Sequence, residues 1–166
     1  PVKLKTNELV EELTKQKLPN SMKVVFDSAC NLACPSCRTN FIRNEDYITN
    51  KSRHILEDVE KSYGNSLEFI SMSGYGDPFY SEALFEWLVN FDSKKYPNMN
   101  NIHIHTNGML WNKHNWNKIK LAQPYIKSAE ISIDAARAET YHNVRKGGKW
   151  DLLIKNLKFI DSLTQV

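Results

Sequence analysis

The chain has 166 residues, of which 41% are hydrophobic, enough to bury the core of one domain. Its formal net charge of +3 is only mildly basic and its lysines are scattered, so the composition gives no indication of nucleic-acid binding. No apolar run approaches the length of a membrane span, and the N-terminus has no signal-peptide pattern. We therefore expect a cytoplasmic protein without a membrane partner.

Strand-like and helix-like segments alternate after Asn20, which is typical of βαβ units and a parallel sheet. Strands are predicted over residues 22–27, 67–73, 102–106 and 129–134. Periodic apolar residues predict helices at Ile55, Leu56 and Val59, at Leu84, Phe85, Leu88 and Val89, and at Leu153, Leu157 and Ile160, with a less regular one around Trp111 and Trp116. We expect a leading helix and linker over residues 1–20 and one core domain over residues 21–166.

Three cysteines, the only ones in the chain, follow the first predicted strand as Cys30, Cys34 and Cys37. Three thiolates can bind three irons of a cubane cluster and leave the fourth iron open for chemistry. A structural zinc site usually has four ligands, and an odd number of cysteines disfavours a disulfide framework. The spacing therefore favours an iron–sulfur centre in a reducing compartment.

The second predicted strand ends in a glycine-rich turn, Ser73-Gly74-Tyr75-Gly76-Asp77, followed by a proline. Its glycines allow a close approach of the backbone to a ligand. A dinucleotide fingerprint is not supported, because the third glycine is missing and the next helix begins late, near Ser81. Taken alone, the segment is also explained by a plain strand-to-helix turn.

The third and fourth predicted strands alternate apolar and polar residues. In the third, His103 and His105 share one face and the strand ends in Thr106-Asn107-Gly108. A histidine pair alone is a weak indication of a metal site, since polar residues are ordinary inside a barrel. In the fourth, Ser132 and Asp134 are predicted to share the polar face.

In this order, the four segments resemble the radical S-adenosylmethionine (radical SAM) superfamily. The fourth strand and the element from Arg145 to Trp150 resemble its peptide-modifying branch, whose members often carry a cysteine-rich C-terminal extension called SPASM. The resemblance implies an α/β fold, a parallel (βα)n partial TIM barrel with about six units. This chain has about four, begins without methionine and stops after the fourth helix, so we expect the truncated N-terminal part of such a barrel.

The resemblance also implies the cofactors and their ligands. Cys30, Cys34 and Cys37 would bind a [4Fe–4S] cluster, and S-adenosylmethionine would be bound by Ser73, Gly74, Tyr75, Gly76, Asp77, Asn107, Ser132, Asp134 and Arg145. Two positions depart from the family pattern: Asp77 is usually glutamate, and Ser36 is often an aromatic residue that packs near the adenine.

By the same resemblance, the cluster takes an electron from a donor of the flavodoxin or ferredoxin type and reductively cleaves S-adenosylmethionine. The resulting 5′-deoxyadenosyl radical abstracts hydrogen from a substrate. The branch favours a peptide or protein substrate, although related branches act on small molecules and RNA.

Three alternatives remain open from the sequence. The chain could be a non-catalytic binding domain on the same scaffold. It could also be a zinc-stabilised α/β domain in which a histidine such as His54 joins the three cysteines. Arg145 could be a surface charge at a helix end.

Overall fold

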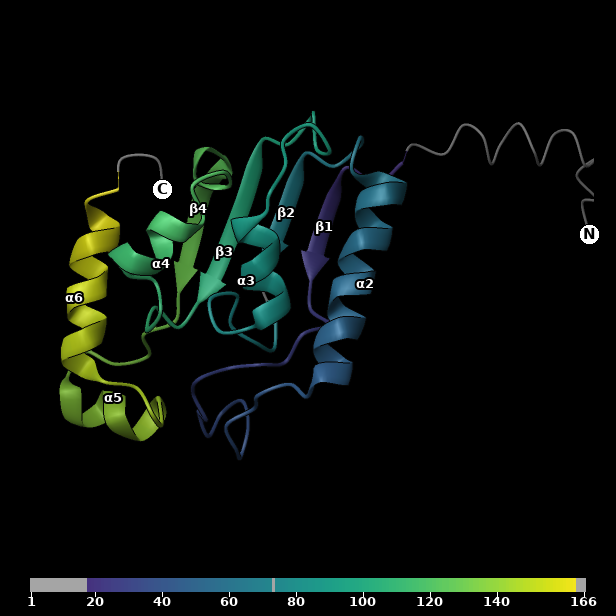
Figure 1. Ribbon diagram of the computed structural model, residues 1–166. Coiled ribbons are helices and arrows are strands. Elements are labelled where there is room, and N and C mark those ends of the chain that lie inside the picture. Colours follow the sequence, from purple (N-terminus) through teal and green to yellow (C-terminus); the bar gives the residue numbers. More distant parts are fainter. Residues whose placement is uncertain (1–17, 73, 164–166) are drawn as a thin grey trace, which may run out of the picture.

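Four parallel strands form one sheet in sequence order in the computed structural model, which describes residues 18–72 and 74–163. They are β1 (Ser21–Val24), β2 (Phe69–Met72), β3 (Asn101–Thr106) and β4 (Ile126–Ile131). All four arrows in Figure 1 point to the same edge of the sheet. The prediction of a parallel α/β sheet with about four βα units is confirmed.

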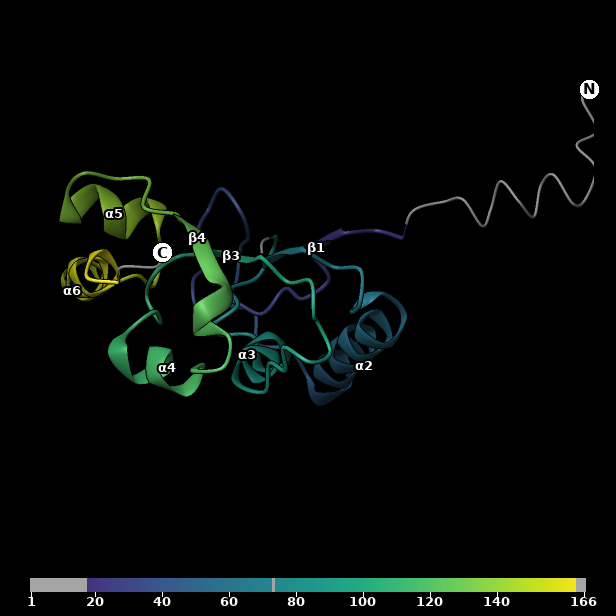
Figure 2. The ribbon, with the colours of Figure 1, turned by 90° about the horizontal axis from the view of Figure 1, so that it is seen from above.

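The helices that follow the strands are α2 (Asp46–Tyr63), α3 (Glu82–Val89), α4 (Lys113–Lys118), α5 (Ala138–Val144) and α6 (Trp150–Asp161), with a 3-10 turn η1 (Gln123–Tyr125) before β4. Seen from above, α2, α3 and α4 lie on one side of the sheet (Figure 2). α5 was not predicted, because Tyr141 is its only buried residue and one anchor gives no periodic pattern. Residues 1–17 of the predicted leading helix and linker lie outside the described residues.

The main core fills the space between the sheet and these helices. β3 contributes Ile102 and Ile104, both fully buried, while His103 and His105 are half-buried on the opposite face. The predicted alternation of this strand is therefore confirmed. Leu56 of α2 and Leu88 of α3 close the core from the helix side.

The fourth strand lies three residues earlier than predicted. β4 ends at Ile131, so Ser132 and Asp134 lie in the loop that follows it. The backbone N–H of Ser132 still donates to the carbonyl of Thr106 at 2.9 Å, but Asp134 adopts a left-handed conformation with φ of 57°. That conformation turns the chain away from the sheet, so the prediction of a strand through residue 134 is wrong.

The first strand is also shorter than predicted, ending at Val24 rather than at residue 27. Beyond it, the glycine-rich turn packs directly on the backbone of Val25, since a Cβ on Gly74 would lie 2.9 Å from the Val25 Cα. Gly74 also has φ of 135°, which side chains of L-residues rarely allow. The turn after β2 is thus fixed against the segment that leads into the cysteines.

Candidate functional site

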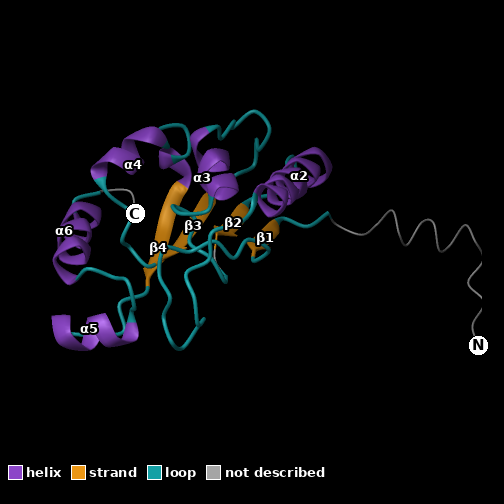
Figure 3. Ribbon diagram, turned by 60° about the horizontal axis from the view of Figure 1, so that its bottom comes forward, coloured by secondary structure: helices purple, strands orange, loops and turns teal. Residues whose placement is uncertain are grey.

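The cysteine loop lies at the carboxyl edge of the sheet, where Figure 3 shows loops gathered, with α5 to the side of them. The backbone N–H of Cys30 donates to the carbonyl of Ile42 at 2.8 Å, which closes the loop. The N–H groups of Cys37 and Arg38 both donate to the carbonyl of Cys34, forming a single turn. Cys30 and Cys34 are buried, Cys37 is exposed, and all three are free thiols.

Every one of the three sulfurs accepts an N–H donor. The donors are the backbone N–H of Leu32 (3.5 Å) and Asn107 Nδ2 (3.6 Å) to Cys30 Sγ, Arg145 Nη1 (3.6 Å) to Cys34 Sγ, and Arg38 Nη2 (3.5 Å) to Cys37 Sγ. Such donors stabilise thiolates, the form in which cysteine binds metals. Burial raises the pKa of the Cys30 thiol, and the Leu32 N–H opposes that rise.

This donor set fits a cubane cluster better than a single ion. Each cysteine of a cubane binds a different iron, so the sulfurs need not converge on one point. Within residues 18–72 and 74–163, no three His, Cys, Asp or Glu side chains converge as ligands of one ion would. His54, the suggested fourth zinc ligand, is 76% exposed on α2 beside Glu57. The arrangement therefore does not support the zinc alternative.

A cavity of about 160 Å³ lies beside the cysteines. Seven of the nine residues predicted to bind the cofactor line it together with the three cysteines, namely Gly74, Tyr75, Gly76, Asp77, Asn107, Ser132 and Arg145. Asp134 reaches it indirectly, through Arg145, and Ser73 lies outside the described residues. The cavity is smaller than the roughly 300 Å³ at the lower end of small-molecule sites, so it can take only part of a ligand of that size.

The glycine-rich turn serves packing as well as lining the cavity. A Cβ on Gly76 would lie 2.6 Å from the carbonyl oxygen of Asp27, so no side chain fits there. Asp77 is 1% exposed, and its Oδ1 accepts the backbone N–H of Phe79 at 3.0 Å. Burial raises the pKa of Asp77, opposed by the N–H and O–H groups that donate to it.

Asn107 connects β3 to the cysteine loop. Its Nδ2 donates to Asn31 Oδ1 at 2.9 Å and approaches Cys30 Sγ at 3.6 Å. Its Oδ1 accepts the backbone N–H of Met109 at 2.9 Å. The side chain is therefore oriented by two partners and presents an N–H to the first cysteine.

Arg145 caps the C-terminal end of α5, but its side chain is only 14% exposed and points into the cavity. Its Nη2 pairs with Asp134 Oδ2 at 2.6 Å, and its buried Nε has no hydrogen-bond partner among the described residues. An orphaned donor beside a cavity can receive an acceptor from a ligand. The alternative in which Arg145 is a surface charge is not supported.

The two histidines of β3 differ in their relation to the cavity. His105 lines it, and its Nε2 lies 3.0 Å from Ser132 Oγ. His103 lies further from the carboxyl edge, with its Nδ1 2.8 Å from Ser128 Oγ. Sequence reasoning did not assign a role to His105, nor to Arg38, although Arg38 directly follows the third cysteine.

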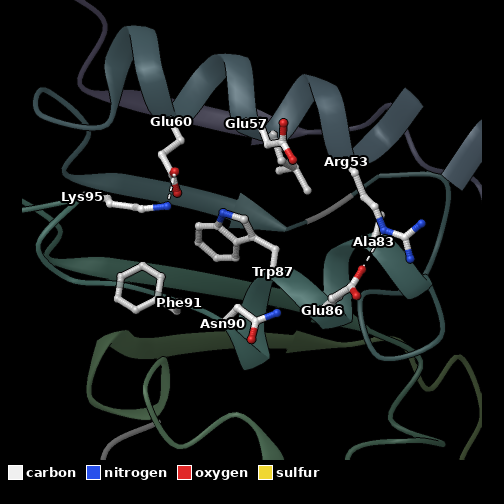
Figure 4. A pocket seen from close by; sticks show the side chains of 10 residues that line it. Arg53, Glu57, Glu60, Ala83, Glu86, Trp87, Asn90, Phe91 and Lys95 are labelled. Atoms are coloured by element: carbon white, nitrogen blue, oxygen red, sulfur yellow. Dashed lines mark hydrogen bonds and ion pairs between the residues drawn. The ribbon is translucent and has the colours of Figure 1, made fainter. Parts of the chain in front are cut away.

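A second cavity, of about 320 Å³, lies between α2 and α3 (Figure 4), and no predicted site residue lines it. Trp87 lies at its centre, and ion pairs stand at its ends: Arg53 with Glu86 and Lys95 with Glu60, both at 2.7 Å. Four of its charged groups thus form ion pairs, which join α2 to α3 at one end and to the segment after α3 at the other. We therefore place the functional site at the cysteines rather than in the cavity between α2 and α3.

Comparisons with known proteins also support an iron–sulfur site. A family model described as a 4Fe-4S single cluster domain matches residues 21–150. A GTP 3′,8-cyclase from Alkaliphilus metalliredigens (strain QYMF) is 24% identical over 152 residues, which are 87% of this chain and 44% of that protein. The chain therefore spans less than half the length of this relative. In the described part of the chain, no helix is both long and apolar enough to cross a membrane.

Solved structures with the same fold include Streptococcus suis SuiB. SuiB bound to the precursor peptide SuiA matches with a TM-score of 0.62 and 18% identity, covering 96% of this chain and 35% of SuiB. SuiB bound to S-adenosylmethionine matches with a TM-score of 0.60 and 18% identity, covering 95% of this chain and 33% of SuiB. At this identity, the likeness shows the fold, and the chain corresponds to about a third of the larger protein.

Proposed function

This chain belongs to the radical SAM superfamily and to its 4Fe-4S single cluster domain family, and we propose that it binds one [4Fe–4S] cluster and S-adenosylmethionine at the cysteine loop. The observation that carries the proposal is that the three cysteines, Arg145 and Ser132 all line one cavity. In this proposal, residues 21–166 form the N-terminal part of the core domain and residues 1–20 precede it.

Each side chain has a definite task in this arrangement. Cys30, Cys34 and Cys37 hold the cluster, and the N–H donors beside them stabilise their thiolates. Arg145 and Ser132 bind the carboxylate of S-adenosylmethionine, because a buried guanidinium and a hydroxyl are its natural partners. When bound, the cluster and S-adenosylmethionine together supply a 5′-deoxyadenosyl radical that abstracts hydrogen from the substrate.

The remaining candidates shape the cavity. Gly74 and Gly76 let the turn lie against the backbone before the cysteines, and Asp77 orients that turn towards β3. Asp134 holds Arg145 in place at 2.6 Å. Tyr75 is 48% exposed at the rim, so its ring is available to the ligand.

For the substrate, we infer a peptide or protein. The support is the resemblance of the Arg145 element to the peptide-modifying branch and the fold shared with SuiB, whose structure contains its precursor peptide. An electron donor of the flavodoxin or ferredoxin type and a reducing, cytoplasmic compartment complete the proposal, since clustered free thiols and an iron–sulfur centre require such conditions.

The test is anaerobic reconstitution of the chain with iron and sulfide. We expect the broad visible absorption of one [4Fe–4S] cluster, with matching iron and sulfide contents, and its loss in Cys30→Ala, Cys34→Ala and Cys37→Ala. Ser36→Ala, in the same turn, is the matched control and should keep the cluster. A full cluster in Cys34→Ala, or one zinc per chain in place of iron, would contradict the proposal. Cleavage of S-adenosylmethionine by the reduced protein separates an enzyme from a binding domain.

A further inference from the structure

Arg38 is the residue whose environment the proposed function does not yet explain. It is only 8% exposed, although it directly follows the exposed Cys37. Its Nη1 donates to the carbonyl of Ser28 at 2.7 Å, and its Nη2 donates to Cys37 Sγ at 3.5 Å. Its Cζ lies 4.6 Å from the centre of the Tyr75 ring. The guanidinium is thus held on two sides while one N–H group faces a cysteine sulfur.

The partners of Arg38 leave its charge uncompensated. The Ser28 carbonyl and the Tyr75 ring carry no net charge, and no ion pair to Arg38 occurs among the described residues. Arg145, which also donates to a cysteine sulfur, is neutralised by Asp134 at 2.6 Å. A guanidinium remains charged at physiological pH, and charges act more strongly in a buried setting than in water.

Tyr75 fixes this geometry from the other side of the loop. Its hydroxyl donates to the carbonyl of Cys37 at 2.8 Å, while its ring lies under the Arg38 guanidinium. The two contacts hold the third cysteine and the arginine against the same side chain. Arg38 therefore keeps a constant position relative to the Cys37 sulfur, as a residue that tunes the electronic properties of a cluster must.

We propose that Arg38 is a positioning residue that raises the reduction potential of the cluster through its uncompensated charge and its hydrogen bond to Cys37. This rests on the proposed function, because it requires that the cysteines hold the cluster. Reduction adds negative charge to the cluster and its thiolates, and a fixed positive charge and an N–H donor stabilise the reduced form more than the oxidised form. The effect is to make the cluster easier to reduce by its electron donor.

The experiment is a redox titration of the reconstituted chain, followed by the spectroscopic signal of the reduced cluster in the absence of S-adenosylmethionine. Arg38→Met keeps an apolar stem and removes the charge and the donor. We expect a tenfold lower ratio of reduced to oxidised cluster at a fixed potential, which corresponds to about 59 mV for one electron. Arg38→Lys keeps the charge without the planar fork, so its reduction potential should lie between those of Arg38→Met and the unaltered chain.

Two controls separate this effect from loss of charge in general and from loop packing. Arg43→Gln removes one positive charge from an exposed position in the same loop and should leave the potential unchanged. Tyr75→Phe removes the hydrogen bond to the Cys37 carbonyl but keeps the ring under Arg38, and should change the potential less than Arg38→Met.

The outcomes distinguish this inference from the proposed function. Failure of the unaltered chain to assemble a cluster would overturn both. A cluster whose potential is the same in Arg38→Met and in the unaltered chain overturns the role of Arg38 alone. Loss of the cluster in both Arg38→Met and Arg38→Lys also overturns it, because Arg38 would then serve to hold the loop through Ser28.

Discussion

Thr106 Oγ1 donates a hydrogen bond to Asp77 Oδ2 at 2.7 Å, and this contact joins the turn after β2 to the end of β3. The same carboxylate oxygen accepts the backbone N–H of Asn107 at 2.9 Å. Asn107 in turn presents its Nδ2 to Cys30 Sγ. The buried carboxylate of Asp77, in the turn after β2, thus positions Asn107, whose side-chain amide faces the first of the proposed cluster ligands.

The first prediction concerns this buried carboxylate. Asp77→Asn places an amide nitrogen against N–H or O–H donors that need an acceptor, so we expect the free energy of unfolding to fall by about 1–3 kcal/mol. Urea denaturation measures the change. Asp58→Asn, the same substitution at an exposed position of α2, should change it little. Equal stability of the two variants would show that the Asp77 hydrogen bonds add nothing to the fold.

A second prediction concerns Arg145 as a cofactor ligand. Arg145→Ala should weaken the binding of S-adenosylmethionine about ten- to a hundred-fold, because a charge-assisted hydrogen bond contributes roughly 1.5–3 kcal/mol. Cluster content should stay the same, since Cys34 remains a ligand. The measurement is titration of the reconstituted chain with S-adenosylmethionine, followed by the spectroscopic signal of the cluster.

The matched control for this titration lies at the other end of the same helix. Arg137, at the N-terminal end of α5, is exposed, and Arg137→Ala should leave the affinity unchanged. An unchanged affinity in a chain that carries both Arg145→Ala and Ser132→Ala would place the carboxylate contact elsewhere.

The sequence predicts the parts of this molecule in which a pattern repeats. Strict alternation of Ile102 and Ile104 with polar residues gives β3 and its buried face correctly. A similar alternation from Ile131 to Asp134 predicts strand there, yet β4 ends at Ile131 and Asp134 adopts a left-handed conformation. Local periodicity does not report a tertiary contact such as the ion pair that holds Asp134.

The candidate site is likewise predictable from the sequence only in part. The cysteines and seven of the other residues that line the cavity are recognisable from the chain, because each segment follows a predicted strand and parallel strands end at one edge. The contact between Arg38 and Cys37 is not, since it depends on how the loop folds back on itself. Asn156 is a further case, a buried polar residue within the apolar stripe of α6.

A third prediction follows from Asn156. Its Nδ2 donates to the backbone carbonyls of Gly108 and Met109, both at 2.9 Å, and thereby ties α6 to the turn after β3. Asn156→Leu has a similar size but leaves both carbonyls without this donor, so we expect a loss of about 1–3 kcal/mol in the free energy of unfolding. Lys155→Leu, at the neighbouring exposed position, serves as the control. Urea denaturation that shows the two variants to be equally stable would rule out this tie.

The last prediction concerns pH and Tyr96, a buried residue that contacts Trp87 of the cavity between α2 and α3. Tyr96 is 2% exposed and its hydroxyl accepts the Nε1–H of Trp87 at 3.1 Å. Burial raises the pKa of Tyr96 from 10.0 to about 12, since the interior disfavours the phenolate.

Between pH 10 and 12, the folded chain therefore keeps a proton on Tyr96 that the unfolded chain has lost. The stabilisation is fully present below pH 10, and the free energy of unfolding should fall as the pH rises through this window, by up to about 1.4 kcal/mol per pH unit. Tyr96→Phe removes the titrating group and should flatten that part of the profile, whereas Tyr47→Phe, at a residue 72% exposed, should leave the slope unchanged. Urea denaturation at several pH values across the window measures the slope, and the same slope in Tyr96→Phe as in the unaltered chain would assign the pH dependence to other groups.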